Sequence, residues 1–158
     1  MKQHILTALL LSAGLCLSGC AGQTNTPPAP EKSPVEDNFP KQNLAMLIDG
    51  TTVEVHWEDN DTVSELLAYT QNLPIIVDTS AYGGFEQVGS LPQSFTRSDV
   101  QITTQPGDIV LYSGNQLVVF FGANSWNYTK LGHIDGLSAD ELTTLLDKNS
   151  TTVEIYCS

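Results

Sequence analysis

Basic residues are scarce in this sequence. Its 158 residues include 6 lysines and arginines against 18 aspartates and glutamates, which gives a formal net charge of −12 at pH 7. A surface of this sign repels nucleic acids, because their binding depends on basic side chains that neutralise phosphates. No part of the chain gathers basic residues into a patch. The composition therefore argues against a nucleic-acid partner.

The sequence also lacks the signatures of several catalytic and metal sites. No serine stands at the centre of a Gly-x-Ser-x-Gly motif, and Gly83-Gly84 is not followed by the Lys-Ser/Thr pair of a phosphate-binding loop. His56 and His133 lie far apart, and the acidic run at residues 58–61 does not continue into a calcium-loop pattern. We therefore predict no metal site and no cofactor, and interpret the acidic run as a turn leading into a helix.

The longest apolar run, at residues 5–17, is too short for a membrane-spanning helix, which needs about 20 apolar residues. Lys2 precedes the run and gives it the positive start of a secretory signal. We therefore predict that residues 1–19 are an export signal and not a membrane helix.

The apolar run ends in Leu17-Ser18-Gly19-Cys20, with an apolar residue three places before the cysteine and two small residues between them. This motif resembles the lipobox of bacterial lipoproteins, in which a peptidase cuts before the cysteine and the thiol is acylated. The resemblance implies that lipidated Cys20 anchors the protein to a membrane of the cell envelope. Two or more acyl chains make such an anchor stable. The outer membrane and the extracytoplasmic face of the plasma membrane both stay open.

Only three cysteines are present, and the signal accounts for two of them. Cys16 would leave with the signal and Cys20 would carry the lipid, which leaves Cys157 alone. A protein with one thiol forms no intramolecular disulfide. Cys157 has no histidine at a catalytic spacing nearby, so we interpret it as a passive thiol.

Residues 20–42 have the composition of a tether that begins with the lipidated cysteine. They contain five prolines together with threonine, glutamine and charged residues, and they show no apolar periodicity. Proline favours an extended and solvated backbone. We therefore expect a Pro-rich, disordered tether here, and one domain over residues 43–158.

The domain shows patterns for about seven strands and two short helices, which is typical of an α+β domain that is mainly β. Strands are expected at residues 43–48, 52–57, 74–78, 109–112, 116–121, 130–134 and 151–156. Turns at residues 49–50 and 113–115 would make two of the connections hairpins. Capping boxes at residues 62–65 and 138–141 precede the two helices. The Gly-rich stretch 80–100 shows no clear element.

Several short stretches follow one another in a recognisable order. They are Tyr82-Gly-Gly-Phe-Glu86, Gly89-Ser-Leu-Pro92, Pro106-Gly-Asp-Ile-Val-Leu-Tyr112, Asn115 with the strand up to Phe121, Trp126-Asn-Tyr-Thr129 and Leu131-Gly-His-Ile134. With them, the chain resembles the bacterial cyclophilin-like domain family from about Met46 to Tyr156. The resemblance implies a closed, cyclophilin-like β-barrel of about eight strands with two short helices. It implies no settled activity, since members occur alone, as lipoproteins or joined to flavodoxin-like modules.

Prolyl isomerases of the cyclophilin type carry Phe-His-Arg, Gly-Gln-Phe and Asn-Ala-Gly segments, and none of these is present in register. Isomerisation needs an apolar pocket and a donor, usually arginine, aimed at the imide nitrogen. Arg97 is the only arginine, and with Phe85, Trp126 and Tyr128 it forms our candidate ligand-binding set. The alternative is that Arg97 pairs with Asp99 or another acid at the surface and that the aromatic residues belong to the barrel core.

We therefore expect a membrane-anchored, non-catalytic module that binds a peptide or a partner protein in the cell envelope. Trp126 and Tyr128 are the best recognition candidates, because amphipathic aromatic side chains suit such contacts. One alternative is a prolyl isomerase that acts on exported proteins, with Arg97 as its donor. Another is an accessory to a flavodoxin-like redox partner, which would itself supply the redox chemistry.

Overall fold

The computed structural model describes residues 42–158, and this part of the chain contains nine strands and two helices. The strands are β1 (Leu44–Ile48), β2 (Thr51–Trp57), β3 (Ile75–Tyr82), β4 (Glu86–Ser90), β5 (Val100–Thr103), β6 (Asp108–Tyr112), β7 (Gln116–Phe120), β8 (Ser125–Asp135) and β9 (Ser150–Cys157). The helices are α1 (Asp61–Thr70) and α2 (Ala139–Leu146). Neither of these two helices is long and apolar enough to cross a membrane. The predicted export signal, Cys20 and the tether as far as residue 41 lie outside the described residues.

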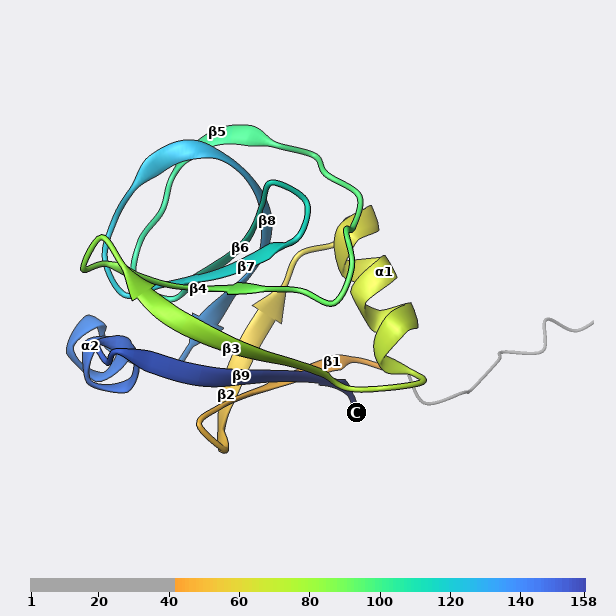
Figure 1. Cartoon of the computed structure of the whole chain (residues 1–158), viewed down its shortest axis with the longest axis horizontal. Helices are drawn as coiled ribbons and strands as arrows, with labels where there is room; N and C mark the ends of the chain where they lie inside the picture. The colour runs from red at the N-terminus through yellow and green to blue at the C-terminus, as the bar shows by residue number, and fades with distance from the viewer. Residues whose placement is uncertain (1–41) are drawn as a thin grey trace, which may run out of the picture. The chain divides into compact units, whose positions relative to one another are not determined.

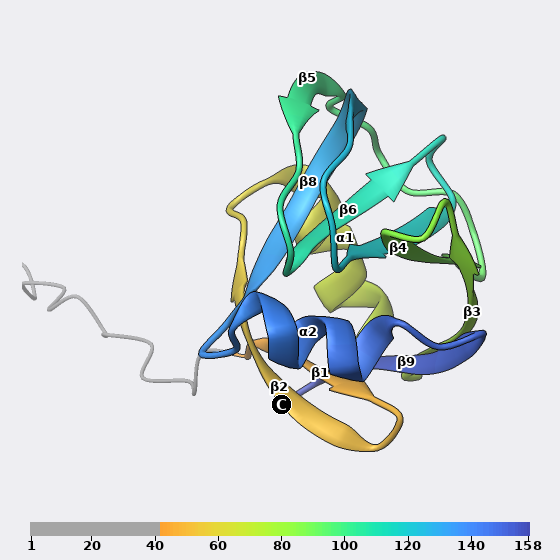
Figure 2. The ribbon, with the colours of Figure 1, turned by 90° about the vertical axis from the view of Figure 1, so that its left-hand side faces the viewer.

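Eight of the strands close into an antiparallel barrel (Figure 1). Their order around the ring is β2, β1, β9, β3, β4, β7, β6, β8, and the pairing of β8 with β2 closes it. The two helices lie on opposite sides of the barrel in Figure 1, and Figure 2 shows α2 in front with α1 behind it. The ninth strand, β5, pairs with β8 outside the ring. The predicted closed barrel of mainly β character is therefore confirmed, with β5 as an additional strand.

The long strand β8 joins the barrel to this additional strand. Its residues 125–128 pair with β5, its middle pairs with β6, and its last residues pair with β2. A register shift at Ile109 and Val110 interrupts the pairing of β6 with β8. Irregularities of this kind bend a strand and increase its twist. Figure 2 shows β8 continuing from the barrel to β5, so this pair extends past the ring.

Two tight turns lie where the sequence predicts them. Asp49 and Gly50 both have positive φ angles, 49° and 75°, between β1 and β2. Ser113 and Gly114, at 52° and 84°, connect β6 to β7. Two consecutive positive φ angles match the right-handed twist of the flanking strands, which explains why these residue types occupy the turns.

The Gly-rich stretch 80–100 contains a strand, β4, that its composition did not predict. Gly89 lies inside β4, and a Cβ atom there would come within 2.4 Å of Val77 Cγ1 and 2.8 Å of the Asp78 carbonyl oxygen. The glycine therefore permits a close approach of β4 to β3. The whole of β5 and the first five residues of β8 were also not predicted as strands.

The N-terminus of α1 differs from the prediction. Its N-cap is Asn60, whose Oδ1 accepts a hydrogen bond of 3.0 Å from the Val63 backbone N–H. The predicted capping box at residues 62–65 is wrong, because both of its polar side chains bind Thr96 instead. Thr62 donates to the Thr96 carbonyl oxygen, and the Glu65 carboxylate accepts from the Thr96 backbone N–H. The second predicted box is confirmed, with Ser138 as the N-cap of α2 and Glu141 as its partner.

The side chains of β6 and β7 are buried on both faces of the sheet, in two separate clusters. Because side chains alternate along a strand, Ile109 and Leu111 point into the barrel and Val110 points outward. The barrel core draws residues from strands all round the ring and from both helices. The outer cluster consists of Val110, Val118, Phe120 and Tyr128, with Phe85, Val88 and Ile102 packed against it. Both clusters lie within residues 42–158, so this part of the chain has its own core.

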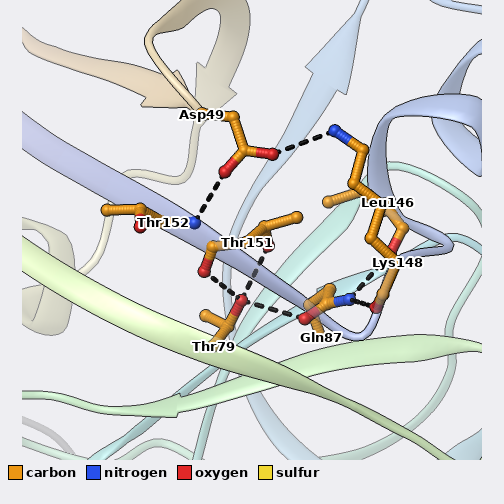
Figure 3. A network of polar contacts seen from close by, with 7 residues as sticks. All are labelled: Asp49, Thr79, Gln87, Leu146, Lys148, Thr151 and Thr152. Carbon is orange, nitrogen blue, oxygen red and sulfur yellow. Dashed lines mark hydrogen bonds and ion pairs between the residues drawn. The ribbon is translucent and has the colours of Figure 1, made fainter.

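A buried polar network joins α2 to the barrel (Figure 3). Gln87 of β4 is fully buried, and its side-chain amide donates hydrogen bonds of 2.7 Å to the carbonyl oxygens of Leu146 and Lys148. Its Oε1 accepts from the Thr79 hydroxyl at 3.0 Å, which also lies 2.7 Å from the Thr151 hydroxyl. Gln87 therefore donates to the carbonyl oxygen of the last residue of α2, which also accepts from the Lys148 backbone N–H, and to the carbonyl oxygen of Lys148 just beyond the helix.

Candidate binding site

A cavity of about 380 Å³ lies on the outer face of the barrel, beside the outer cluster. Val88 of β4 and Val118 of β7, which lie opposite each other in the sheet, are among its lining residues. The other lining side chains are aromatic or polar: Tyr82, Glu86, Tyr112, Gln116, Asn124, Trp126 and Tyr128. This size and this mixture of apolar surface with a few polar groups are typical of sites for small ligands or single side chains.

The aromatic side chains of the cavity divide into a buried base and an exposed rim. Tyr128 is only 4 % exposed, and its ring packs edge-on against Tyr112, with centroids 5.9 Å apart, and against Phe120, at 5.7 Å. Its hydroxyl accepts a hydrogen bond of 2.9 Å from the Asn124 side-chain amide. Trp126 is 55 % exposed. A ligand would therefore meet a rigid aromatic base next to an aromatic surface that is still open to solvent.

Among the described residues, only Glu86 of β4 contributes a carboxyl group to the lining of the cavity. Glu86 is 6 % exposed, and its Oε2 has no hydrogen-bond partner among the described residues. Burial raises the pKa of this carboxyl from its usual 4.5 to about 7. Burial and then the charge of Glu86 also raise the pKa of the Tyr128 hydroxyl. A buried polar atom without a partner is uncommon in folded proteins and marks a candidate functional group.

No lysine or arginine of the described part neutralises Glu86, because all three are paired with other acids. Arg97 pairs with Asp99, Lys130 with Glu58 and Asp108, and Lys148 with Asp49. The cavity therefore combines aromatic rings with a carboxyl group whose partner the described residues do not supply.

The structure brings two of the four predicted ligand-binding residues into this cavity. Trp126 and Tyr128 line it, two positions apart on β8. Phe85 is not a lining residue, since its ring stacks on Phe120 in the outer cluster with centroids 6.4 Å apart. Arg97 is not a lining residue either, and its exposed guanidinium forms an ion pair with Asp99. The pair raises the pKa of Arg97, and it lowers the pKa of Asp99.

Sequence reasoning did not single out Glu86, Tyr82, Tyr112 or Asn124. The stretch from Tyr82 to Glu86 contributed to the family resemblance, but β4 was not predicted, so the face on which Glu86 lies was unknown. A strand assignment for residues 86–90 would have placed Glu86 and Val88 together on one face. That is the signal that would have identified the carboxyl.

A second group of ionisable residues lies around Asp108, at the start of β6. His133 Nδ1 is 3.0 Å and Lys130 Nζ is 3.4 Å from Asp108 Oδ1, while the Gln105 backbone N–H donates to Oδ2. These contacts hold the turn before β6 against β8, which is a structural role. Within residues 42–158, no three histidine, cysteine, aspartate or glutamate residues come together as metal ligands would.

A larger hollow, of about 570 Å³, lies between β2 and α2. Its charged side chains are already engaged or exposed: Lys148 pairs with Asp49, Glu141 caps α2, and Glu54 and Asp135 are exposed to solvent. It contains no aromatic side chain and no buried, unpaired polar group. The cavity at Glu86 is therefore the stronger candidate site.

The model of the cyclophilin-like family matches residues 46–156 of this chain. The chain belongs to the cyclophilin-like family. The match runs from β1 to β9 and includes every residue that lines the Glu86 cavity, so the cavity lies within the fold of the family. A comparison with curated proteins found no match. Membership of the cyclophilin-like family therefore establishes the barrel, and the function has to be argued from the site.

Proposed function

We propose that this member of the cyclophilin-like family is a lipid-anchored, non-catalytic module that binds a peptide or a segment of a partner protein in the cell envelope. The observation that carries the proposal is the cavity at Glu86, where an exposed tryptophan borders a rigid aromatic base. Aromatic anchors with a few polar groups are the usual determinants of peptide recognition.

The arrangement of Arg97 favours binding over isomerisation. Catalysis of prolyl isomerisation calls for a donor held beside the imide nitrogen within the binding pocket. The only arginine of the chain does not line the cavity, and its guanidinium is engaged by Asp99. The cavity itself is lined by phenols, side-chain amides and a carboxyl, which can form hydrogen bonds that orient a ligand.

Exchange NMR on residues 21–158 with a panel of Xaa-Pro peptides tests this proposal. We expect no acceleration of cis/trans exchange, together with peptide-dependent shifts at Trp126 and Tyr128. Trp126→Ala should weaken this binding at least about tenfold, as the loss of a central aromatic anchor does. Ile76→Ala, which removes another exposed apolar side chain away from the cavity, is the matched control and should leave binding unchanged.

The same experiment distinguishes the isomerase alternative. Acceleration that disappears in Arg97→Ala, while the variant stays folded, would establish an isomerase and overturn the non-catalytic proposal. Binding that survives in Trp126→Ala would move the site away from this cavity.

The lipid anchor is tested separately, because its motif lies outside the described residues. We expect the full chain to incorporate labelled palmitate and to sediment with membranes, and Cys20→Ala to do neither. A Cys157→Ala variant controls for acylation of the other thiol that remains after removal of the signal. Palmitate incorporation in Cys20→Ala would contradict the anchor.

A further inference from the structure

We infer that the cavity at Glu86 recognises an organic ammonium group, with the Glu86 carboxylate as its counter-ion and the rings of Tyr112, Trp126 and Tyr128 around it. The inference rests on the proposed binding function and names the chemical group that the cavity takes. It deepens that proposal without depending on which peptide or molecule carries the group.

The unpaired carboxyl of Glu86 favours a cationic ligand. Glu86 is more than nine-tenths buried, lines the cavity, and leaves Oε2 without a hydrogen-bond partner among the described residues. An ionised carboxylate in such a place is strongly destabilised unless a cation or hydrogen-bond donor reaches it. A ligand that brings a cation would restore the missing partner.

The aromatic rings of the cavity are arranged to surround a cation. Tyr112 and Tyr128 meet at an interplanar angle of 68°, so they present two differently oriented aromatic surfaces to the same cavity, and Trp126 adds a third ring. Aromatic rings attract ammonium groups through their negative faces, and cages of such rings recognise lysine and quaternary ammonium groups. A neutral apolar ligand would gain from the rings but would leave the carboxyl unpaired.

The charges of the domain also favour a cationic ligand. Every lysine and arginine in residues 42–158 is held by another acid, so no such side chain within this part competes for the site. The strongly negative net charge of the chain favours the approach of cations over anions. Binding of a cation selects the ionised form of Glu86, so affinity should rise with pH. The other titratable groups that line the cavity are the hydroxyls of Tyr82, Tyr112 and Tyr128.

The test compares a cation with its uncharged shape analogue. Residues 21–158 are titrated by NMR with choline and with 3,3-dimethyl-1-butanol, in which a carbon replaces the charged nitrogen. We expect choline to bind at least about tenfold more tightly at pH 8. Between pH 8 and pH 6 this advantage should fall about tenfold, because the ionised fraction of a carboxyl with a pKa of about 7 changes by that factor. n-Butylammonium, the analogue of a lysine side chain, decides whether a primary amine is accepted as well as a quaternary one.

Two variants connect the effect to the site. Glu86→Gln should reduce the preference for the cation at pH 8 about tenfold and abolish its pH dependence, while 3,3-dimethyl-1-butanol still binds, which also shows that the cavity is intact. Glu154→Gln, a glutamate of β9 that does not line the cavity, should behave like the wild type. Equal affinities for the charged and uncharged analogues, or unchanged choline binding in Glu86→Gln, would overturn the inference.

The failure of this inference is distinguishable from the failure of the proposed function. If proline peptides shift the cavity resonances while neither ammonium compound does, the binding module stands and the ammonium site is refuted. If none of these ligands perturbs the cavity, both proposals fail.

Discussion

Glu86 and Gln87 are consecutive residues of β4, and both are buried, but within residues 42–158 only the side chain of Gln87 finds hydrogen-bond partners. Gln87 bonds to the end of α2 and to Thr79, whereas Glu86 faces the cavity with Oε2 unpaired. The alternation of side chains along the strand directs the two residues to opposite faces. One strand therefore provides both an anchor for the barrel and the carboxyl of the candidate site.

The stability of the domain should depend on pH through Glu86. The pKa of this carboxyl is about 7 in the folded state and near 4.5 when it is exposed, so the folded state holds the proton more tightly. Stability from this group is therefore complete below about pH 4.5 and is lost as the pH rises to 7. At about 1.36 kcal/mol per pKa unit, the loss is as much as ~3 kcal/mol.

Urea denaturation at pH 5 and pH 8 measures this loss. The side chain introduced by Glu86→Gln cannot ionise. The free energy of unfolding of this variant, relative to that of the wild type, should therefore be higher at pH 8 than at pH 5. The wild type is compared with the variant at each pH because other carboxyls titrate in the same range. Glu154→Gln is the control and should follow the wild type. If Glu86→Gln also followed the wild type at both pH values, the raised pKa of Glu86 would be contradicted.

Gln87→Ala should destabilise the domain by about 1–3 kcal/mol, because it removes the buried side-chain amide that donates to the carbonyl oxygens of Leu146 and Lys148 and accepts from Thr79. Chemical denaturation measures the loss, and hydrogen exchange should show weaker protection at the end of α2. Gln101→Ala removes an exposed glutamine from β5 and should change stability by less than about 0.5 kcal/mol. Equal effects of the two substitutions would show that the buried network contributes nothing.

Gly89→Ala should destabilise the domain by about 1–3 kcal/mol, since its Cβ would meet the backbone oxygen of Asp78 at 2.8 Å as well as the Val77 side chain. The strands β3 and β4 would have to separate, which would also displace Glu86. Thermal denaturation measures the stability, with Ser90→Ala, the exposed neighbour in β4, as the control. Wild-type stability of Gly89→Ala would mean that the two strands are not so closely packed.

Asn60→Ala should cost about 1–2 kcal/mol, because Asn60 caps α1 and its side chain also donates to the Lys130 carbonyl oxygen. Asp59→Ala, which changes the exposed residue immediately before it, should have a much smaller effect in the same denaturation experiment. An equal effect at the two positions would argue against Asn60 as the cap.

The local chemistry of the sequence determined much of the barrel. The turns at Asp49-Gly50 and Ser113-Gly114, the second capping box and the strands that follow clear alternation or apolar runs were all predictable, because each depends on residues that are close in the chain. The prediction of the first capping box was wrong for the opposite reason. Its side chains bind Thr96, about thirty residues away, and no local pattern contains that partner.

The candidate site was decided by tertiary structure. Trp126 and Tyr128 were identifiable as amphipathic aromatic residues, but Glu86 becomes part of a site only when β4 pairs with β7 and the β5–β8 extension lies outside the ring. Burial then raises the pKa of its carboxyl, and no described neighbour supplies a partner. The sequence by itself determined which residues can form strands, turns and aromatic surfaces. Only the closure of the barrel decided which carboxyl is removed from water and placed beside those rings, because burial is a property of the whole packing and not of any segment.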